Sequence, residues 1–82
     1  MILAVVQTPY YDWDGRKYIE FLIENKFVRV KIPFRYGRVM CRVEGLKTVQ
    51  ELQKGDQVAI QLTKKTWDGI EYWILSYLKY DF

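Results

Sequence analysis

Apolar and polar residues alternate along much of this chain, and this period of two is its strongest constraint on fold. Alternation is typical of β-strands with one buried face, because successive side chains point to opposite sides of a strand. Segments that alternate, or are rich in strand-forming residues, predict six strands. They span Ile2–Tyr11, Arg16–Glu24, Lys26–Phe34, Arg38–Glu44, Gln57–Thr66 and Ile70–Tyr80.

Short turn signals separate several of these strands. Asp14-Gly15 and Asp68-Gly69 both predict hairpins, because glycine reaches the positive φ that tight hairpin turns need. Asn25 tolerates the left-handed region, so a third tight turn is expected around it. Pro33 has no backbone N–H, so the third strand should end there or lie at an edge.

One short helix fits between the fourth and fifth strands. Thr48 and Glu51 have the spacing of a capping box, in which each side chain satisfies a free N–H of the first turn. We therefore expect a helix over Thr48–Gln53, near the open end of an all-β fold. Five or six strands with one helix to plug an end favour a small closed barrel over a sandwich. The buried side of the helix would comprise Leu46, Val49 and Leu52.

The composition of the 82 residues predicts a single domain, 1–82, with a packed core. The chain has no histidine, which excludes His-based acid–base catalysis and His-ligated zinc. Its one cysteine, Cys41, excludes an intramolecular disulfide and alternates with Val39 and Val43, so it reads as a buried small hydrophobe. Apolar runs are too short for a membrane span or a signal peptide, and we expect a cytoplasmic protein, or one inside a host cell.

Enzyme chemistry is poorly supported by the remaining side chains. Asp12 and Asp14 form the only close pair of acids, and they lie in a turn where Asp is expected for structural reasons. No glycine-rich loop is present to hold a phosphate. We therefore expect a binding protein rather than an enzyme, with no cofactor and no metal site.

Two turns repeat the pattern W-D-G-x-x-Y, beginning at Trp13 and at Trp67. Each Trp is equally well explained as a ring that packs back on its own strand or as an exposed ring beside cations. The neighbouring cations are Arg16 and Lys17 in the first loop, and Lys64 and Lys65 in the second. An exposed indole beside a cation is typical of a surface on which a ligand stacks.

The middle of the chain is basic, since no acidic residue occurs between Asn25 and Val43. One explanation is a solvated strand face whose charges prevent edge-to-edge aggregation. The other is binding of a single-stranded nucleic acid, because cations neutralise phosphates and rings stack on bases. Phe27, Arg29 and Lys31 share one face of the third strand, and Arg35, Tyr36 and Arg38 follow in a loop.

These features resemble the small OB-fold single-stranded DNA-binding proteins, including those of phages and archaeal viruses. The resemblance rests on the order of the elements, on loop chemistry and on the entry into a strand at 54–58 after the helix. It implies that nucleic acid lies across the second and third strands, between the two Trp-Asp-Gly loops. The resemblance places Trp13, Arg16, Tyr18, Phe27, Arg29, Lys31, Lys65 and Trp67 at the cleft.

The segment Arg38–Glu44 departs from this pattern, because a five-stranded barrel needs no sixth strand. Either the third and fourth predicted strands are one long strand bent at Pro33–Gly37, or the barrel is of another kind, such as SH3-like.

The sequence thus predicts binding of single-stranded DNA or RNA, most simply DNA, with little sequence preference. The full set of expected contact residues is Trp13, Arg16, Lys17, Tyr18, Phe27, Arg29, Lys31, Arg35, Tyr36, Arg38, Lys64, Lys65 and Trp67.

A different class of function stays open, namely a protein-interaction or assembly module that uses surface aromatics. Trp73, Tyr77 and Tyr80 on the last strand are more rings than one face of a small barrel buries. They predict a homodimer through that strand, with or without nucleic-acid binding.

Overall fold

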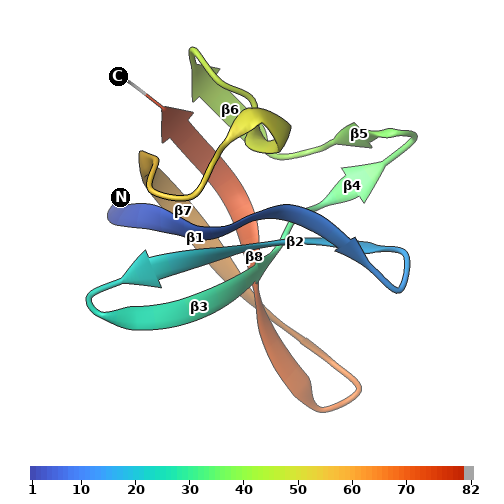
Figure 1. Cartoon of the computed structure of the whole chain (residues 1–82). Coiled ribbons are helices and arrows are strands. Elements are labelled where there is room, and N and C mark those ends of the chain that lie inside the picture. Colours follow the sequence, from blue (N-terminus) through green and yellow to red (C-terminus); the bar gives the residue numbers. More distant parts are fainter. Residues whose placement is uncertain (81–82) are drawn as a thin grey trace.

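The computed structural model describes residues 1–80, which form a small β-barrel with short additional elements (Figure 1). The barrel strands are β1 (Ile2–Trp13), β2 (Arg16–Ile23), β3 (Lys26–Lys31), β7 (Gln57–Trp67) and β8 (Ile70–Tyr80). The other elements are β4 (Phe34–Arg35), β5 (Arg38–Val39), β6 (Arg42–Gly45) and the 3-10 turn η1 (Val49–Glu51).

The five long strands close on themselves. Their order is β3-β2-β1-β7-β8, and each neighbouring pair in that order is antiparallel. The barrel closes where β3 pairs with β8 in parallel, Val30 opposite Trp73 and Lys31 opposite Ile74. The predicted all-β, OB-like barrel of five or six strands is therefore confirmed.

The sixth strand extends the third. β6 pairs in parallel with β8 from Arg42 opposite Tyr77 to Gly45 opposite Tyr80, directly beyond the residues that pair with β3. β3 and β6 thus follow the same edge of β8, and the hairpin of β4 and β5 interrupts them. The interruption begins at Pro33, where the missing N–H ends β3 as expected.

Two boundaries differ from the sequence-based expectation for this reason. The third strand ends at Lys31 and not at Phe34, and the segment Arg38–Glu44 is divided into β5 and β6 around Met40. The Met40 N–H instead donates to the Pro33 carbonyl at 2.8 Å, which holds the base of the β4–β5 hairpin.

The predicted turns are confirmed. Asp14 and Gly15 have φ of 55° and 74°, and Asp68 and Gly69 have φ of 51° and 74°. Positive φ at both central residues is the mark of the type I′ hairpin, whose twist matches that of paired strands. Asn25 likewise has a φ of 66° in the turn between β2 and β3.

The core fills the barrel with the inward-facing residues of all five strands. Ile19 and Phe21 from β2 and Val30 from β3 are fully buried, as their alternation predicts. Val49 and Leu52 close one end, and the Gly55 N–H donates to the Val6 carbonyl at 2.9 Å to hold this segment on β1.

The expected helix over Thr48–Gln53 is reduced to the single 3-10 turn η1, and Leu46 is 80% exposed instead of buried. The capping residues still interact, because the Glu51 carboxylate accepts from the Thr48 N–H at 3.0 Å and from the Thr48 hydroxyl at 2.9 Å. The Asp56 carboxylate then accepts from the Gln53 N–H at 2.9 Å. This hydrogen bond forms a turn over residues 53–56, and the helix does not continue beyond η1.

No helix in the described part of the chain is long and apolar enough to cross a membrane.

Candidate functional site

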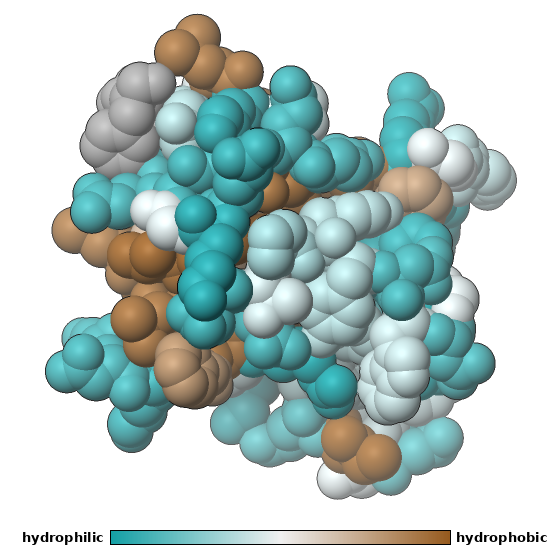
Figure 2. Space-filling model, viewed as in Figure 1, coloured by the Kyte–Doolittle hydropathy of each residue, from teal (hydrophilic) through white to brown (hydrophobic). Residues whose placement is uncertain are grey.

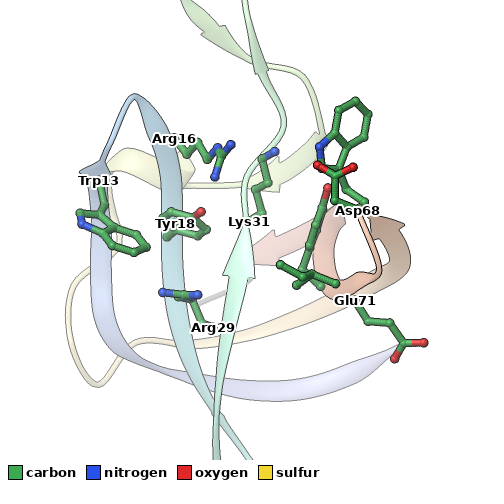
Figure 3. Close-up of a pocket in the computed structure, with 10 residues that line it drawn as sticks. Trp13, Arg16, Tyr18, Arg29, Lys31, Asp68 and Glu71 are labelled. Carbon is green, nitrogen blue, oxygen red and sulfur yellow. The ribbon is translucent and has the colours of Figure 1, made fainter.

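A groove runs between the outer face of β2 and β3 and the projecting hairpin of β7 and β8 (Figure 3). The two Trp-Asp-Gly loops contribute to opposite walls of this groove. Its lining comprises Trp13, Arg16, Tyr18, Arg29, Lys31, Trp67, Asp68, Ile70, Glu71 and Tyr72.

Strand register brings the first wall together. Trp13 lies opposite Arg16 across the β1–β2 ladder, and Tyr18 of β2 lies opposite Lys31 of β3. Residues that face each other across antiparallel strands point to the same side of the sheet. Because the alternate residues Ile19 and Val30 fill the core, these four side chains point outward.

Arg29 is the centre of an aromatic cluster on this wall. Its guanidinium carbon lies 5.4 Å from the centroid of Trp13 and 4.9 Å from that of Tyr18. The two rings are 6.2 Å apart and tilted by 48°. Tyr18 is only 8% exposed, whereas Trp13 is 57% exposed. The Tyr18 ring is therefore packed against its neighbours, and the indole of Trp13 is largely open to solvent.

Glu20, which lies opposite Arg29 across the β2–β3 ladder, is held by other groups. The Glu20 carboxylate accepts from the Thr8 hydroxyl at 3.1 Å and from the Tyr11 hydroxyl at 2.9 Å. Burial raises the pKa of Tyr11, and its hydrogen bond to Glu20 raises that pKa further. Tyr11 in turn packs 5.7 Å from the Tyr18 ring, so this network supports the cluster from below.

The second wall is the β7–β8 hairpin. Tyr72 lies beneath the Lys31 ammonium, 5.4 Å from ring centroid to Nζ, which joins the two walls. Trp67 and Ile70 face each other across the hairpin, and each is 66% exposed. A large apolar surface is therefore presented next to the cations of β2 and β3.

Two acids also lie on this second wall. Glu71 forms an ion pair with Lys64 at 2.8 Å, and Figure 3 shows its carboxylate directed away from Arg29 and Lys31. Asp68 sits in the turn itself. Within the described residues 1–80, Arg16, Arg29 and Lys31 form no ion pair, and Glu20, which lies opposite Arg29 across the β2–β3 ladder, is hydrogen-bonded to Thr8 and Tyr11 instead.

Six of the residues expected from the sequence meet in this groove, namely Trp13, Arg16, Tyr18, Arg29, Lys31 and Trp67. The sequence reasoning missed Asp68, Ile70, Glu71 and Tyr72. The repeat contained a signal for Tyr72, which holds the same place after its Trp-Asp-Gly turn as Tyr18 does after the first. Both tyrosines lie under a cation.

The other expected residues do not line the groove. Lys17 pairs with Asp12 and lies over Phe34, and Lys64 lies over Trp73 as well as pairing with Glu71. Phe27 is 70% exposed at the far end of β3, beside Leu22. The remaining ones are Lys65 on the β7–β8 hairpin and Arg35, Tyr36 and Arg38 on the β4–β5 hairpin.

The aromatic residues of β8 have partners within the chain. Lys64 lies over Trp73, the Tyr77 hydroxyl donates to Glu44 at 2.7 Å, and Lys47 lies over Tyr80. β8 is hydrogen-bonded to β7 on one side and to β3 and β6 on the other. A homodimer through this strand stays a prediction, and it would have to use side chains rather than a free backbone edge.

In the described residues, no group of three or more His, Cys, Asp or Glu side chains is placed to hold a metal ion. Cys41 is half-buried, and desolvation by this burial raises the pKa of its thiol. A raised pKa lowers the fraction of reactive thiolate at neutral pH.

No family model, no curated protein and no solved structure matches this chain. The function therefore has to be inferred from the chemistry of the groove.

Proposed function

We propose that the groove binds single-stranded nucleic acid, most simply DNA, with little sequence preference. The observation that carries this proposal is the pairing of cations with rings. Arg29 lies over Trp13 and Tyr18, and Lys31 lies over Tyr72, in one groove between two loops that each present a tryptophan.

This arrangement suits the two parts of a nucleotide. A guanidinium or ammonium placed over a ring keeps its positive charge and its N–H donors, so it can still contact a phosphate. The exposed faces of Trp13 and Trp67 can each stack on a base, at about 1–3 kcal/mol per base. Stacking accepts every base, so weak sequence preference follows.

Intrinsic tryptophan fluorescence tests the proposal directly. Titration with oligo-dT, oligo-rU and a duplex at two salt concentrations should show a change with single strands, weaker binding at the higher salt, and the weakest response with duplex. Phosphate contacts release counterions, which is the reason for the salt dependence. Unchanged fluorescence with excess single strands, or tighter sequence-specific binding of duplex, would contradict the proposal.

A matched pair of variants separates the groove from general charge. Arg16→Ala removes a groove cation, and Lys54→Ala removes an exposed cation from the turn that follows η1. Both lower the net charge by one. Arg16→Ala should weaken binding to all single strands alike, whereas Lys54→Ala should leave affinity almost unchanged. Equal losses would point to long-range attraction without a site in the groove.

A protein-interaction module remains the alternative, and the acids of the second wall favour it. Asp68 and Glu71 repel phosphates but attract a cationic segment of a partner protein. Asp68→Asn distinguishes the two functions. It should strengthen binding of oligonucleotides if the ligand is a polyanion, and weaken binding of a lysine- and aromatic-containing peptide if the ligand is a protein.

A further inference from the structure

The β4–β5 hairpin is a basic surface that the groove does not include. It projects at the upper right of Figure 1, on the same side of the view as the β1–β2 loop. Figure 2 shows mostly hydrophilic and neutral colour on this projection. Its turn comprises Arg35, Tyr36, Gly37 and Arg38, all of them exposed, which we name the basic tip.

The charges of the basic tip work against the stability of the hairpin. Arg35 lies directly opposite Arg38 in the β4–β5 pairing. Residues opposite one another point to the same side, and like charges in that position repel. The neighbouring pair, Phe34 and Val39, points to the other side, where Val39 packs against the core, so both arginines point away from the barrel. In the part of the chain that the structure describes, neither arginine forms an ion pair.

The backbone of the basic tip is also strained. Tyr36 has a φ of 54°, in the left-handed region that a bulky side chain rarely adopts. Asp14 and Asp68 hold the corresponding position in the two Trp-Asp-Gly turns, where aspartate tolerates this conformation. The Tyr36 ring gains no packing in return, because it is 86% exposed and makes no ring or cation contact among residues 1–80. Strain and repulsion together in one exposed turn are typical of a site that serves a ligand rather than the fold.

The hairpin that carries the basic tip begins beside the groove. The Ile32 N–H donates to the Lys17 carbonyl at 2.9 Å, and the Lys17 ammonium lies 5.2 Å from the centroid of the Phe34 ring. Lys17 directly follows Arg16, which lines the groove. Tyr36 is two residues beyond Phe34, about 7 Å at the rise of a β-strand. A single strand that leaves the groove at Arg16 therefore comes within reach of the basic tip.

We infer that the basic tip binds the same single strand beyond the groove, so that the binding site has two parts. Arg35 and Arg38 hold a phosphate between them, and the Tyr36 ring stacks on a base. The phosphate removes the repulsion between the two guanidiniums, and no acidic residue between Asn25 and Val43 opposes it. This inference rests on the proposed function, because the groove supplies the first contacts.

Two substitutions remove the chemistry of the basic tip while they suit the hairpin better than the parent residues do. Tyr36→Asn removes the ring and gives the turn the Asn-Gly pair that a type I′ hairpin prefers. Arg35→Glu places opposite charges across the two strands. Both variants should melt at or above the temperature of the parent chain, so a loss of binding cannot be attributed to unfolding. The matched controls are Tyr36→Phe, which keeps a ring, and Lys54→Glu, which makes the same charge change at an exposed residue near η1.

Fluorescence anisotropy with labelled oligo-dT of ~5 and ~15 nucleotides, within the range that barrels of this kind bind, tests the two-part site. Tyr36→Asn and Arg35→Glu should bind the shorter strand like the parent chain and the longer strand about tenfold more weakly. Tyr36→Phe and Lys54→Glu should stay close to the parent chain at both lengths.

Each other result has a distinct meaning. If Tyr36→Asn and Arg35→Glu bind the longer strand as tightly as the parent chain does, the basic tip makes no contact, while the groove proposal stands. An equal loss at both lengths would contradict a site in two parts. If the parent chain binds neither strand, the groove proposal and this inference both fail.

Polyglutamate tests an acidic protein segment as the alternative occupant of the basic tip. It carries negative charge but has no base to stack on Tyr36. It should bind the parent chain more weakly than oligo-dT of equal length, and Tyr36→Asn should not change its affinity. Tighter binding of polyglutamate than of oligo-dT, reduced by Arg35→Glu, would overturn the assignment to nucleic acid.

Discussion

Two cations at opposite ends of the barrel, Lys47 and Lys31, have different surroundings. At the end closed by η1, Lys47 lies over the Tyr80 ring and also 2.9 Å from the Asp56 carboxylate. At the groove, Arg29 and Lys31 lie over Trp13, Tyr18 and Tyr72 and form no ion pair among the described residues, although Lys64 and Glu71 are paired on the second wall. Figure 1 shows the two regions apart, with the 3-10 turn at the top and the β7–β8 loop at the bottom.

This difference separates side chains that hold the fold from side chains that are available to a ligand. A carboxylate neutralises the cation beside it and accepts its N–H donors. A ring attracts a cation without neutralising it, so the cation keeps its charge for another partner. Variants at the closed end should therefore change stability, and variants at the groove should change binding.

The largest effect is expected from Gly45→Ala, near the closed end. Gly45 has a φ of 110°, and a Cβ there would clash with the Tyr80 carbonyl oxygen across the β6–β8 pairing. Backbone strain and the clash together should cost about 3 kcal/mol of unfolding free energy. Urea denaturation measures this loss. Gly37→Ala is the control, because a Cβ at Gly37 meets nothing within 4 Å and only its φ of 77° is unfavourable. Equal losses in both variants would show that the clash with Tyr80 is relieved.

Next in size is the loss of the two loop tryptophans. Trp13→Ala and Trp67→Ala should each weaken single-strand binding by about 1–3 kcal/mol if the rings stack on bases. Trp13→Ala should also lower the melting temperature, because its ring packs against Arg29 and Tyr18. Trp67→Ala should leave the melting temperature unchanged, because the Trp67 side chain is 66% exposed. Fluorescence titration and thermal melting measure the two effects, with Trp73→Ala as a control outside the groove. A Trp67→Ala protein that melts early yet binds normally would assign this turn to structure alone.

A smaller effect is expected on the salt dependence of binding, which should differ between variants of Lys31 at the groove and Lys47 at the closed end. If Lys31 contacts a phosphate, Lys31→Ala should reduce the slope of log affinity against log salt by roughly 0.7, the value for one contact on a single strand. Lys47→Ala removes the same charge at the closed end, where Asp56 already neutralises it, and should leave the slope unchanged. Equal slopes in the parent chain and Lys31→Ala would exclude a phosphate contact at Lys31.

The smallest effect is a loss of stability in acid. Hydrogen bonds from the Thr48 backbone and side chain lower the pKa of Glu51, and those from the Gln53 N–H and Lys47 lower the pKa of Asp56. Each carboxylate therefore stabilises the fold above its unfolded pKa, about 4, and loses that contribution as pH falls through its lowered pKa. Glu51 is exposed and Asp56 is half-buried at the surface, so solvent screening keeps the effect small. Melting temperatures between pH 6 and pH 3 should fall less steeply in Asp56→Asn than in the parent chain. The same slope in both would show that Asp56 is not a source of the acid sensitivity.

Local chemistry allowed the strands and turns to be predicted. The alternation in Arg16–Glu24 placed Ile19 and Phe21 inside, and both are fully buried. Asp14-Gly15 and Asp68-Gly69 form tight turns, because a residue pair that tolerates positive φ specifies a type I′ hairpin with little help from its surroundings. Pro33 ended its strand for an equally local reason.

The expected helix shows where local signals were insufficient. Thr48 and Glu51 make the reciprocal contact that a capping box implies, but the chain turns into β7 after a single 3-10 turn. Asp56 captures the Gln53 N–H, and Gly55 bonds to Val6 on β1. The first contact is local, whereas the second ties the segment to a strand far away in the sequence; the two together outweighed the helical preference, and Leu46 stays in solvent.

The sequence alone determined which side chains face outward on β2 and β3, because the period of two depends only on the backbone, whereas bulges interrupt that period in β1 and β7. It did not determine where along a strand those side chains meet others. Phe27 and Arg29 share one face of β3, yet barrel closure places Arg29 against Trp13 and leaves Phe27 beside Leu22 at the other end. Pairing of β3 with β8 brings Lys31 over Tyr72, forty-one positions later in the chain. Such contacts depend on register and strand order, which are set by packing of the whole core, so only the tertiary structure separated the groove from the far end of β3.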